Sequence, residues 1–162
     1  MGQASFLSPI GQILLRAEAG SLNSIEIVAD GTRQEQSPDS VLIEAVAQLR
    51  AWFGGTLDQF DLPLARPNTP KGQAHRAAIA SIPFGETLSY GALARMIGSS
   101  PRAIGQACRR NPFPIVIPCH RVVGAGGAIG YYSGGAGVST KLWLLDHERR
   151  YAKGDDDDGF HD

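Results

Sequence analysis

The sequence has few of the features that mark secreted, membrane-spanning or metal-binding proteins. Two cysteines in 162 residues are too few for a disulfide framework and suit a reducing compartment. No apolar run approaches the roughly 18–20 residues that span a bilayer. The N-terminus lacks the basic, apolar and small-residue succession of a secretory signal. Four histidines without clustered cysteines give no metal-ligand pattern. We therefore expect a cytoplasmic protein with no membrane segment, metal or cofactor.

The sequence does contain enough apolar material for a folded core, and its charge is unevenly distributed. Hydrophobic residues make up 43% and charged residues 19% of the chain, as in soluble globular proteins. The net charge of −1 conceals nine basic and three acidic side chains in residues 85–153, followed by five aspartates in 154–162. A basic segment of this kind suits a polyanionic partner such as nucleic acid, although a solvated surface has the same composition.

The first half of the chain has the pattern of a small sheet-and-helix unit. Residues 10–17 and 22–28 are two β-prone segments joined by a short turn, which predicts a hairpin. Apolar residues then recur at helical spacing from Val41 to Phe53. Ser37 or Ser40 is the expected helix cap, and Gly54-Gly55 is the expected end. These elements predict an α/β (α+β) fold with an N-terminal domain over residues 1–66.

The second half has mostly helical patterns. Three prolines in residues 61–70 indicate a linker, and a domain over 67–153 follows. Helices are predicted at 73–82, at 88–97 with an apolar stripe of Leu88, Leu93 and Ile97, and at 101–110. The last two helices flank a tight Gly-containing turn, as in a helix-turn-helix, a pattern that also occurs in proteins that never contact DNA.

The remaining segments of the second half are less regular. Residues 111–123 are rich in proline and β-branched residues and are predicted to be extended, whereas 124–137 form a glycine-rich loop. An amphipathic helix is predicted at 141–151, built on Leu142 and Leu145, with Trp143 as a further candidate for its apolar face. The acidic residues 154–162 are expected to be a disordered tail.

The segment 115–123 carries the clearest chemical signal. It delivers Cys119 directly before His120 and Arg121. A thiolate is the reactive form of cysteine, and neighbouring cationic or hydrogen-bonding groups stabilise it. A histidine base needs a third group to fix its tautomer, and Glu148 on the last helix is a candidate. The alternative interpretation is a buried cysteine that acts as a small hydrophobe.

Asn111-Pro112 followed by Ile117-Pro118-Cys119-His120-Arg121-Val122-Val123 resembles the active-site signature of the O6-alkylguanine-DNA alkyltransferases. The resemblance continues through residues 82–150 without gaps. Its further motifs are Pro83-Phe84-Gly85-Glu86-Thr87-Leu88-Ser89-Tyr90, Arg102-Ala103-Ile104-Gly105-Gln106-Ala107, Gly130-Tyr131-Tyr132-Ser133-Gly134-Gly135 and Leu144-Leu145-Asp146-His147-Glu148.

The resemblance implies a repair protein that takes an alkyl group from O6 of guanine onto Cys119. His120 would remove the thiol proton through a water, and Glu148 would orient His120. Asn111 would support the turn beneath the thiol. Tyr90 would donate to the purine as the alkyl group leaves; without the family match, a half-buried aromatic in a helix would be the better explanation. The substrate pocket would be formed by Tyr132, Ser133, Gly134, Val122 and Cys108.

The resemblance also implies double-stranded DNA as the partner of a monomer, contacted in the minor groove. The target oxygen is out of reach in a duplex, so the base must be flipped out, and Arg102 would enter the stack in its place. The small residues Ala103, Gly105 and Ala107 would allow close approach of the helix, and Arg109 and Arg110 would meet phosphates. Packing of helices against this small-residue face is the alternative. Cys108 is interpreted as a packing or groove-facing residue rather than as a second nucleophile.

The sequence departs from the family pattern before Pro83 and in the acidic tail. Lys71, His75 and Arg76 stand where large apolar and aromatic residues are typical, which leaves open how that helix packs.

Three other functions remain: an alkyltransferase-like DNA binder, against which Cys119 argues, a thiol hydrolase, and a helix-turn-helix regulator.

Overall fold

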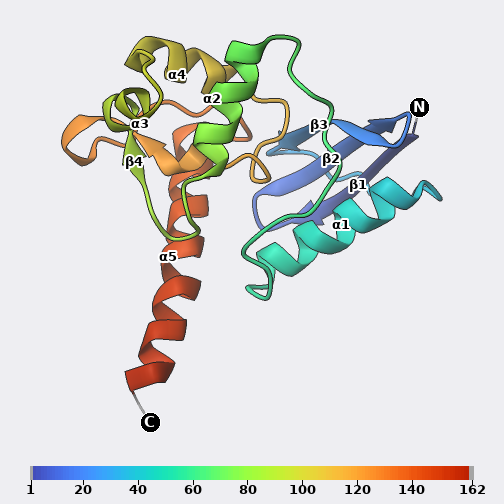
Figure 1. Ribbon diagram of the computed structural model, residues 1–162. Helices are drawn as coiled ribbons and strands as arrows, with labels where there is room; N and C mark the ends of the chain where they lie inside the picture. The colour runs from blue at the N-terminus through green and yellow to red at the C-terminus, as the bar shows by residue number, and fades with distance from the viewer. Residues whose placement is uncertain (1, 161–162) are drawn as a thin grey trace.

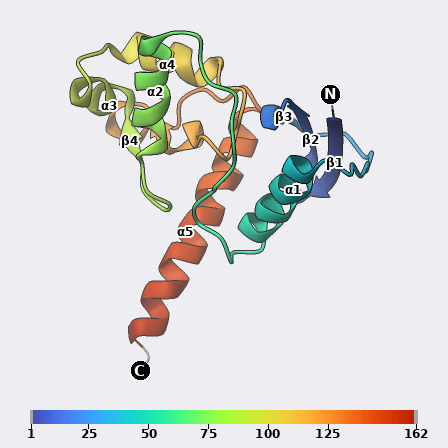
Figure 2. The same ribbon diagram turned by 45° about the vertical axis from the view of Figure 1, so that its right-hand side comes forward.

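The computed structural model describes residues 2–160, with the backbone alone for 153–160. The backbone of the last helix continues to Phe160, where a disordered tail was expected from residue 154, and residues 161–162 lie outside the described part of the chain. The fold is mixed α and β, as predicted. In Figures 1 and 2 the sheet and α1 lie on one side of the molecule, and α2, α3 and α4 lie on the other. None of the helices in the described part of the chain is both long and apolar enough to cross a membrane.

The N-terminal part is a three-stranded antiparallel sheet in the order β1 (Gly2–Ser8), β2 (Gly11–Glu18) and β3 (Ser21–Val28). The predicted hairpin is confirmed as β2 and β3. Its turn holds Ala19 and Gly20 at positive φ, 53° and 81°, as a tight two-residue hairpin turn requires. β1 was not predicted. It pairs Phe6 with Ile13 and supplies Phe6, 2% exposed, to the core.

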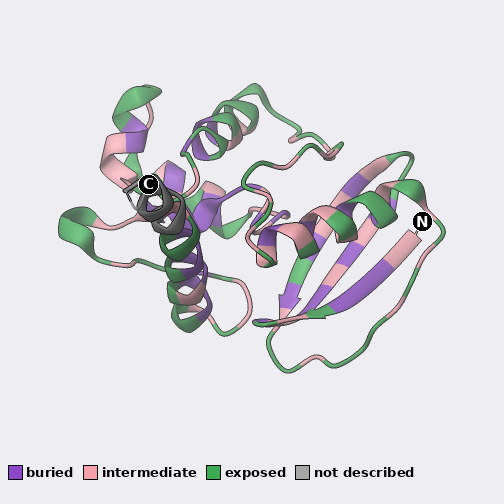
Figure 3. Ribbon diagram, turned by 90° about the horizontal axis from the view of Figure 1, so that it is seen from below, coloured by how far each residue is buried: buried purple, intermediate pink, exposed green. Residues whose placement is uncertain are grey.

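Helix α1 (Ser40–Phe53) covers one face of this sheet, as Figure 3 shows from below. Its Leu42, Leu49 and Trp52 are fully buried. The predicted caps Ser37 and Ser40 are wrong, because the Asp39 side chain accepts the hydrogen bond from the Val41 amide at 2.9 Å. A carboxylate close to the first free N–H groups also complements the positive end of the helix.

The predicted linker is held along the edge of β3. The Leu22 amide donates to Pro63 O, and the Ala65 amide donates to Leu22 O, both at 2.8 Å. Helix α2 (Pro70–Ala80) then begins three residues earlier than predicted, because Thr69 caps it and Pro70 occupies its first turn.

The structure corrects two predictions for the second half. Leu88 and Ser89 form strand β4, which pairs with β5 (Val122–Val123), so helix α3 (Tyr90–Met96) begins at Tyr90 and not at residue 88. Ser89 caps this helix by accepting from the Ala92 amide at 3.0 Å. Within residues 111–123, which were predicted to be extended, only Val122–Val123 form a strand: the chain turns at Ile115, where φ is 76°, and again in the 3-10 helix η1 (Cys119–Arg121).

Helix α4 (Pro101–Arg109) was predicted closely and packs against α3. A short 3-10 turn, η2 (Ala125–Gly127), interrupts the glycine-rich segment. The final helix α5 (Val138–Phe160) starts earlier than predicted, and of its predicted apolar residues Leu145 is buried but Leu142 is not. Leu142 is 46% exposed, whereas Lys141, Leu144 and Glu148 are at most 1% exposed.

Helix α5 also joins the two parts of the molecule. His147 stacks on Trp143, with ring centroids 5.0 Å apart, and its Nε2 hydrogen-bonds Trp52 O at 2.8 Å. The Trp52 ring lies 4.4 Å from His147 and 6.3 Å from His120. The end of α1 therefore packs directly against the helix that carries Glu148.

Candidate active site

Asn111 shapes the segment that presents Cys119. Its Nδ2 donates to Ile117 O at 2.8 Å and to Cys119 Sγ at 3.3 Å, while its Oδ1 accepts from the Phe113 amide at 2.9 Å. These three bonds span the turns on both sides of Ile115. One amide side chain therefore fixes the loop conformation and also supplies a donor to the sulfur.

A buried ionic cluster lies behind the cysteine. Glu148 is 1% exposed and receives Nε and Nη2 of Arg121 at 2.7–3.1 Å, His120 Nε2 at 2.7 Å and the Gly85 amide at 3.2 Å. The remaining arm of Arg121 donates to Ile82 O at 2.6 Å. A buried carboxylate with this many donors is well compensated, and it fixes both side chains that follow Cys119.

The protonation states follow from this cluster. Burial would raise the pKa of Glu148, but the hydrogen bond from His120 and the guanidinium of Arg121 lower it to about 2. Glu148 is therefore an ionised acceptor, and His120 Nε2 must carry the hydrogen between them. Burial lowers the pKa of His120, so the ring is neutral at pH 7. Its Nδ1, buried and without a protein hydrogen-bond partner among the described residues, is then a free basic nitrogen.

The cysteine itself is 5% exposed. Burial raises the pKa of its thiol, and the Asn111 hydrogen bond and the charge of Lys141 act in the opposite direction. The resting group is therefore a thiol, and a base is needed to make it a nucleophile.

Lys141 is a site residue that the sequence analysis missed. It is fully buried, and its Nζ donates to Val122 O at 2.7 Å and to Tyr131 O at 3.3 Å. The ammonium also lies 5.8 Å from the centre of the Tyr90 ring. Its position four residues before Leu145 and seven before Glu148 places it on the inner face of α5, which was the available sequence signal.

Cys119 lines a hollow of about 200 Å³, which we call the thiol cavity. The structure brings Tyr132, Ser133 and Gly134 to it, as the sequence analysis expected of the pocket loop. The opposite wall is Ile25, Glu26 and Ile27 of β3. Backbone bonds from the Ile25 amide to Pro112 O (2.8 Å) and from the Gly135 amide to Ile27 O (3.2 Å) hold this strand against both sides of the cavity.

A second hollow of about 370 Å³, the helix hollow, lies along one flank of α4. It collects Tyr90, Arg102, Gly105, Cys108 and Arg109 with the exposed Tyr131, whose ring lies 5.1 Å from the Arg109 guanidinium. Tyr131 of the helix hollow is followed directly in the chain by Tyr132 of the thiol cavity, so the same loop borders both hollows. Glycine at position 130 lets this loop lie close to the Tyr90 side chain, because a Cβ there would lie 3.1 Å from Tyr90 Oη.

The other expected site residues lie elsewhere. Val122 is buried in β5 and does not line either hollow. Ala103, Ala107 and Arg110 lie on the opposite flank of α4. Burial raises the pKa of Tyr90, so its hydroxyl stays protonated and can donate. No group of three or more His, Cys, Asp or Glu gathers as a metal site within the described residues.

Comparison with known proteins agrees with this geometry. Residues 72–150 match the family described as 6-O-methylguanine DNA methyltransferase, DNA binding domain. The methylated-DNA–protein-cysteine methyltransferase of Methanosarcina acetivorans is 38% identical over 90% of this chain and 98% of its own length. The protein of that name from Mycobacterium leprae is 40% identical over 88% of each chain.

A solved structure extends the match to the whole fold. Mycobacterium tuberculosis OGT in complex with DNA superposes with a TM-score of 0.79 at 36% identity, covering 92% of this chain and 93% of that one. These matches define a class of cysteine acceptor proteins built on this fold. The chain belongs to the O6-methylguanine-DNA methyltransferase family.

Proposed function

We propose that this protein repairs DNA by moving an alkyl group irreversibly from O6 of guanine onto Cys119, once per chain. The observation that carries the proposal is the position of the Cys119 sulfur. It lines a cavity, accepts a hydrogen bond from Asn111, and is followed in sequence by a neutral histidine that a buried carboxylate orients. The names and coverage of its relatives support the same activity.

The bonds and protons of this transfer balance without a cofactor. His120 Nδ1 takes the thiol proton through a water, the sulfur attacks the alkyl carbon, and the C–O6 bond breaks. The electron pair passes to the purine, which takes up one proton from water and becomes guanine, while His120 returns the thiol proton to water. Tyr90 is the hydrogen-bond donor on the purine side. The product is a thioether, which neither His120 nor water hydrolyses, so the chain does not turn over.

The base must leave the duplex to reach a sulfur that is 5% exposed. The exposed Arg102 on α4 is our proposed occupant of the vacated stack, and the small residues Ala103, Gly105 and Ala107 allow this helix to enter the minor groove. Arg109 and Arg110 are the proposed phosphate contacts. We further propose that the protein acts as a monomer in the cytoplasm.

Mass spectrometry of the intact protein after incubation with O6-methylguanine duplex DNA tests the proposal. We expect a gain of one methyl group per chain, with no gain in Cys119→Ala and an unchanged gain in Cys108→Ala. Product formation beyond one equivalent would instead indicate a thiol hydrolase. Binding without a gain in mass would indicate a damage reader or a regulator.

A further inference from the structure

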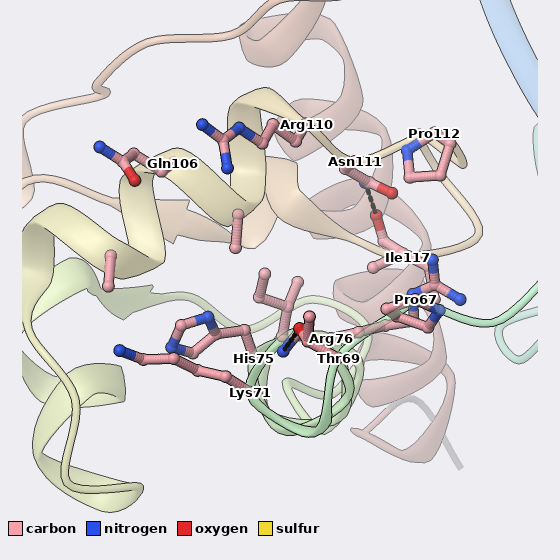
Figure 4. Close-up of a pocket in the computed structure, with 14 residues that line it drawn as sticks. Pro67, Thr69, Lys71, His75, Arg76, Gln106, Arg110, Asn111, Pro112 and Ile117 are labelled. Carbon is pink, nitrogen blue, oxygen red and sulfur yellow. Dashed lines mark hydrogen bonds between the residues drawn. The ribbon is translucent and has the colours of Figure 1, made fainter.

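A third hollow of about 360 Å³ lies between α2 and α4, and we call it the α2–α4 cleft. Figure 4 shows its two walls, with Lys71 and His75 on α2 and Gln106 and Arg110 on α4. No aspartate or glutamate lines the cleft, and its lining includes the apolar Ala103 and Ala107. A cationic rim above a small-residue floor suits a sugar-phosphate chain, because deoxyribose packs on apolar atoms while its phosphates meet cations.

Two of the unusual residues in this cleft are already committed to structural contacts. His75 Nε2 hydrogen-bonds Ser99 Oγ at 2.9 Å and ties α2 to the turn between α3 and α4. Arg76 donates to Ala65 O at 2.7 Å, and its guanidinium lies 5.2 Å from the Phe113 ring centre. Lys71 and Arg110 are both exposed, and neither has an acidic side chain within 4 Å among the described residues. They are therefore available cations on opposite walls.

The position of the cleft relative to α4 identifies its occupant. Arg102, Gln106 and Arg109 are exposed and spaced as one ridge of the helix. The helix hollow with Tyr90 and Cys108 lies on one flank of this ridge, and the α2–α4 cleft lies on the other. A ridge placed along a minor groove has one sugar-phosphate strand on each side. The strand that everts its base must pass on the side of the helix hollow, because the loop that borders this hollow at Tyr131 continues into the thiol cavity at Tyr132.

We infer that the α2–α4 cleft holds the backbone of the undamaged DNA strand, with Lys71 and Arg110 contacting its phosphates. This inference rests on the proposed function, since it takes α4 to lie in the minor groove of a damaged duplex. It assigns the two flanks of the helix to different strands. It also gives a role to Lys71, a residue outside both the thiol cavity and the helix hollow.

The test compares a duplex with its own damaged strand alone. For Lys71→Gln we expect duplex affinity to fall roughly two- to fivefold, as for loss of an exposed ion pair. The slope of log K against log salt should flatten by about 0.9, the value for one phosphate contact on B-DNA. Affinity for the single strand carrying O6-methylguanine, and the rate with free O6-benzylguanine, should stay at wild-type values. Arg110→Gln should behave in the same way, and Lys71→Arg should restore duplex binding.

Arg149→Gln, which removes an exposed charge from α5, is the matched control and should leave both DNA affinities unchanged. An equal loss on single-stranded and duplex DNA would place Lys71 against the damaged strand and overturn the inference. An unchanged duplex affinity and salt slope would also overturn it, while leaving the methyl gain at Cys119 intact. Failure of the wild-type protein to gain a methyl group would instead remove the proposed function itself.

Discussion

Replacing Glu148 with glutamine is the most direct test of the buried cluster. The amide keeps the size of the side chain but removes the charge that offsets Arg121, which is 6% exposed. The guanidinium would remain in place, donating to Ile82 O and to a neutral oxygen. Breaking a buried pair by removing one partner costs about 3–5 kcal/mol of unfolding free energy. For a chain of this size that lowers Tm by roughly 6–20 °C.

The pKa of Glu148 gives an independent estimate of the same quantity. A carboxyl group whose pKa falls from 4.5 to about 2 on folding stabilises the native state by about 3 kcal/mol at neutral pH. Because the folded pKa is the lower one, this stabilisation is complete above about pH 5 and is lost as the pH falls toward 2. The difference between wild type and Glu148→Gln should therefore narrow over this window.

Urea denaturation followed by tryptophan fluorescence measures the loss of unfolding free energy and its dependence on pH, since Trp52 lies against His120. Asp146→Asn on the same helix is the matched control. Its carboxylate makes an exposed pair with Arg150 at 3.5 Å, for which we expect less than about 0.5 kcal/mol. The double variant Glu148→Gln/Arg121→Met should recover part of the loss, because it removes both charges. A Glu148→Gln protein within 1 kcal/mol of wild type at pH 7, or a difference independent of pH, would refute this reasoning.

Three further predictions follow from the site and the fold. Arg102→Ala should slow repair of duplex DNA far more than reaction with O6-benzylguanine, and equal slowing in the two rate assays would argue against a role in base extrusion. Asn111→Ala should slow methyl transfer at pH 7 by about tenfold or more, because a hydrogen bond to the thiolate is lost. Its pH–rate profile should move to higher pH as the thiol pKa rises, and a lower rate with an unmoved profile would contradict that account. Asp39→Ala should reduce the unfolding free energy by about 1 kcal/mol in urea titrations, whereas Ser40→Ala should change it by less than half as much; the reverse order would restore serine as the cap of α1.

Local patterns predicted the elements that are held by their own sequence. The hairpin of β2 and β3 has β-prone apolar residues on both sides of a positive-φ turn, and α4 is bounded by Ser100 and Arg110. Elements that depend on distant partners were missed or misplaced. β1 contains little besides Phe6 to mark a strand, and Leu88-Ser89 becomes a strand only because Val122-Val123 lies beside it. The predicted helix therefore began two residues before the observed start of α3 at Tyr90.

The site shows the same division between local and distant information. Cys119, His120 and Asn111 stand within nine residues of one another, and the motif that contains them drew attention to all three. Lys141 was overlooked because a lysine reads as a surface residue, and only the carbonyls of Val122 and Tyr131 explain its burial. The wall formed by Ile25 and Ile27 has no chemical signature at all. Its role comes from packing between segments almost a hundred residues apart.

That wall has a consequence for selectivity. The edge of β3 is bonded to the cysteine segment at Ile25 and to the pocket loop at Ile27, so the strand acts as a rigid spacer that sets how far apart these two segments stand. The largest alkyl group that fits beside the sulfur is then limited by an N-terminal sheet that supplies no reacting group. We therefore expect substitutions at Ile25 or Ile27 to change which alkyl groups are accepted without altering the Pro-Cys-His-Arg sequence.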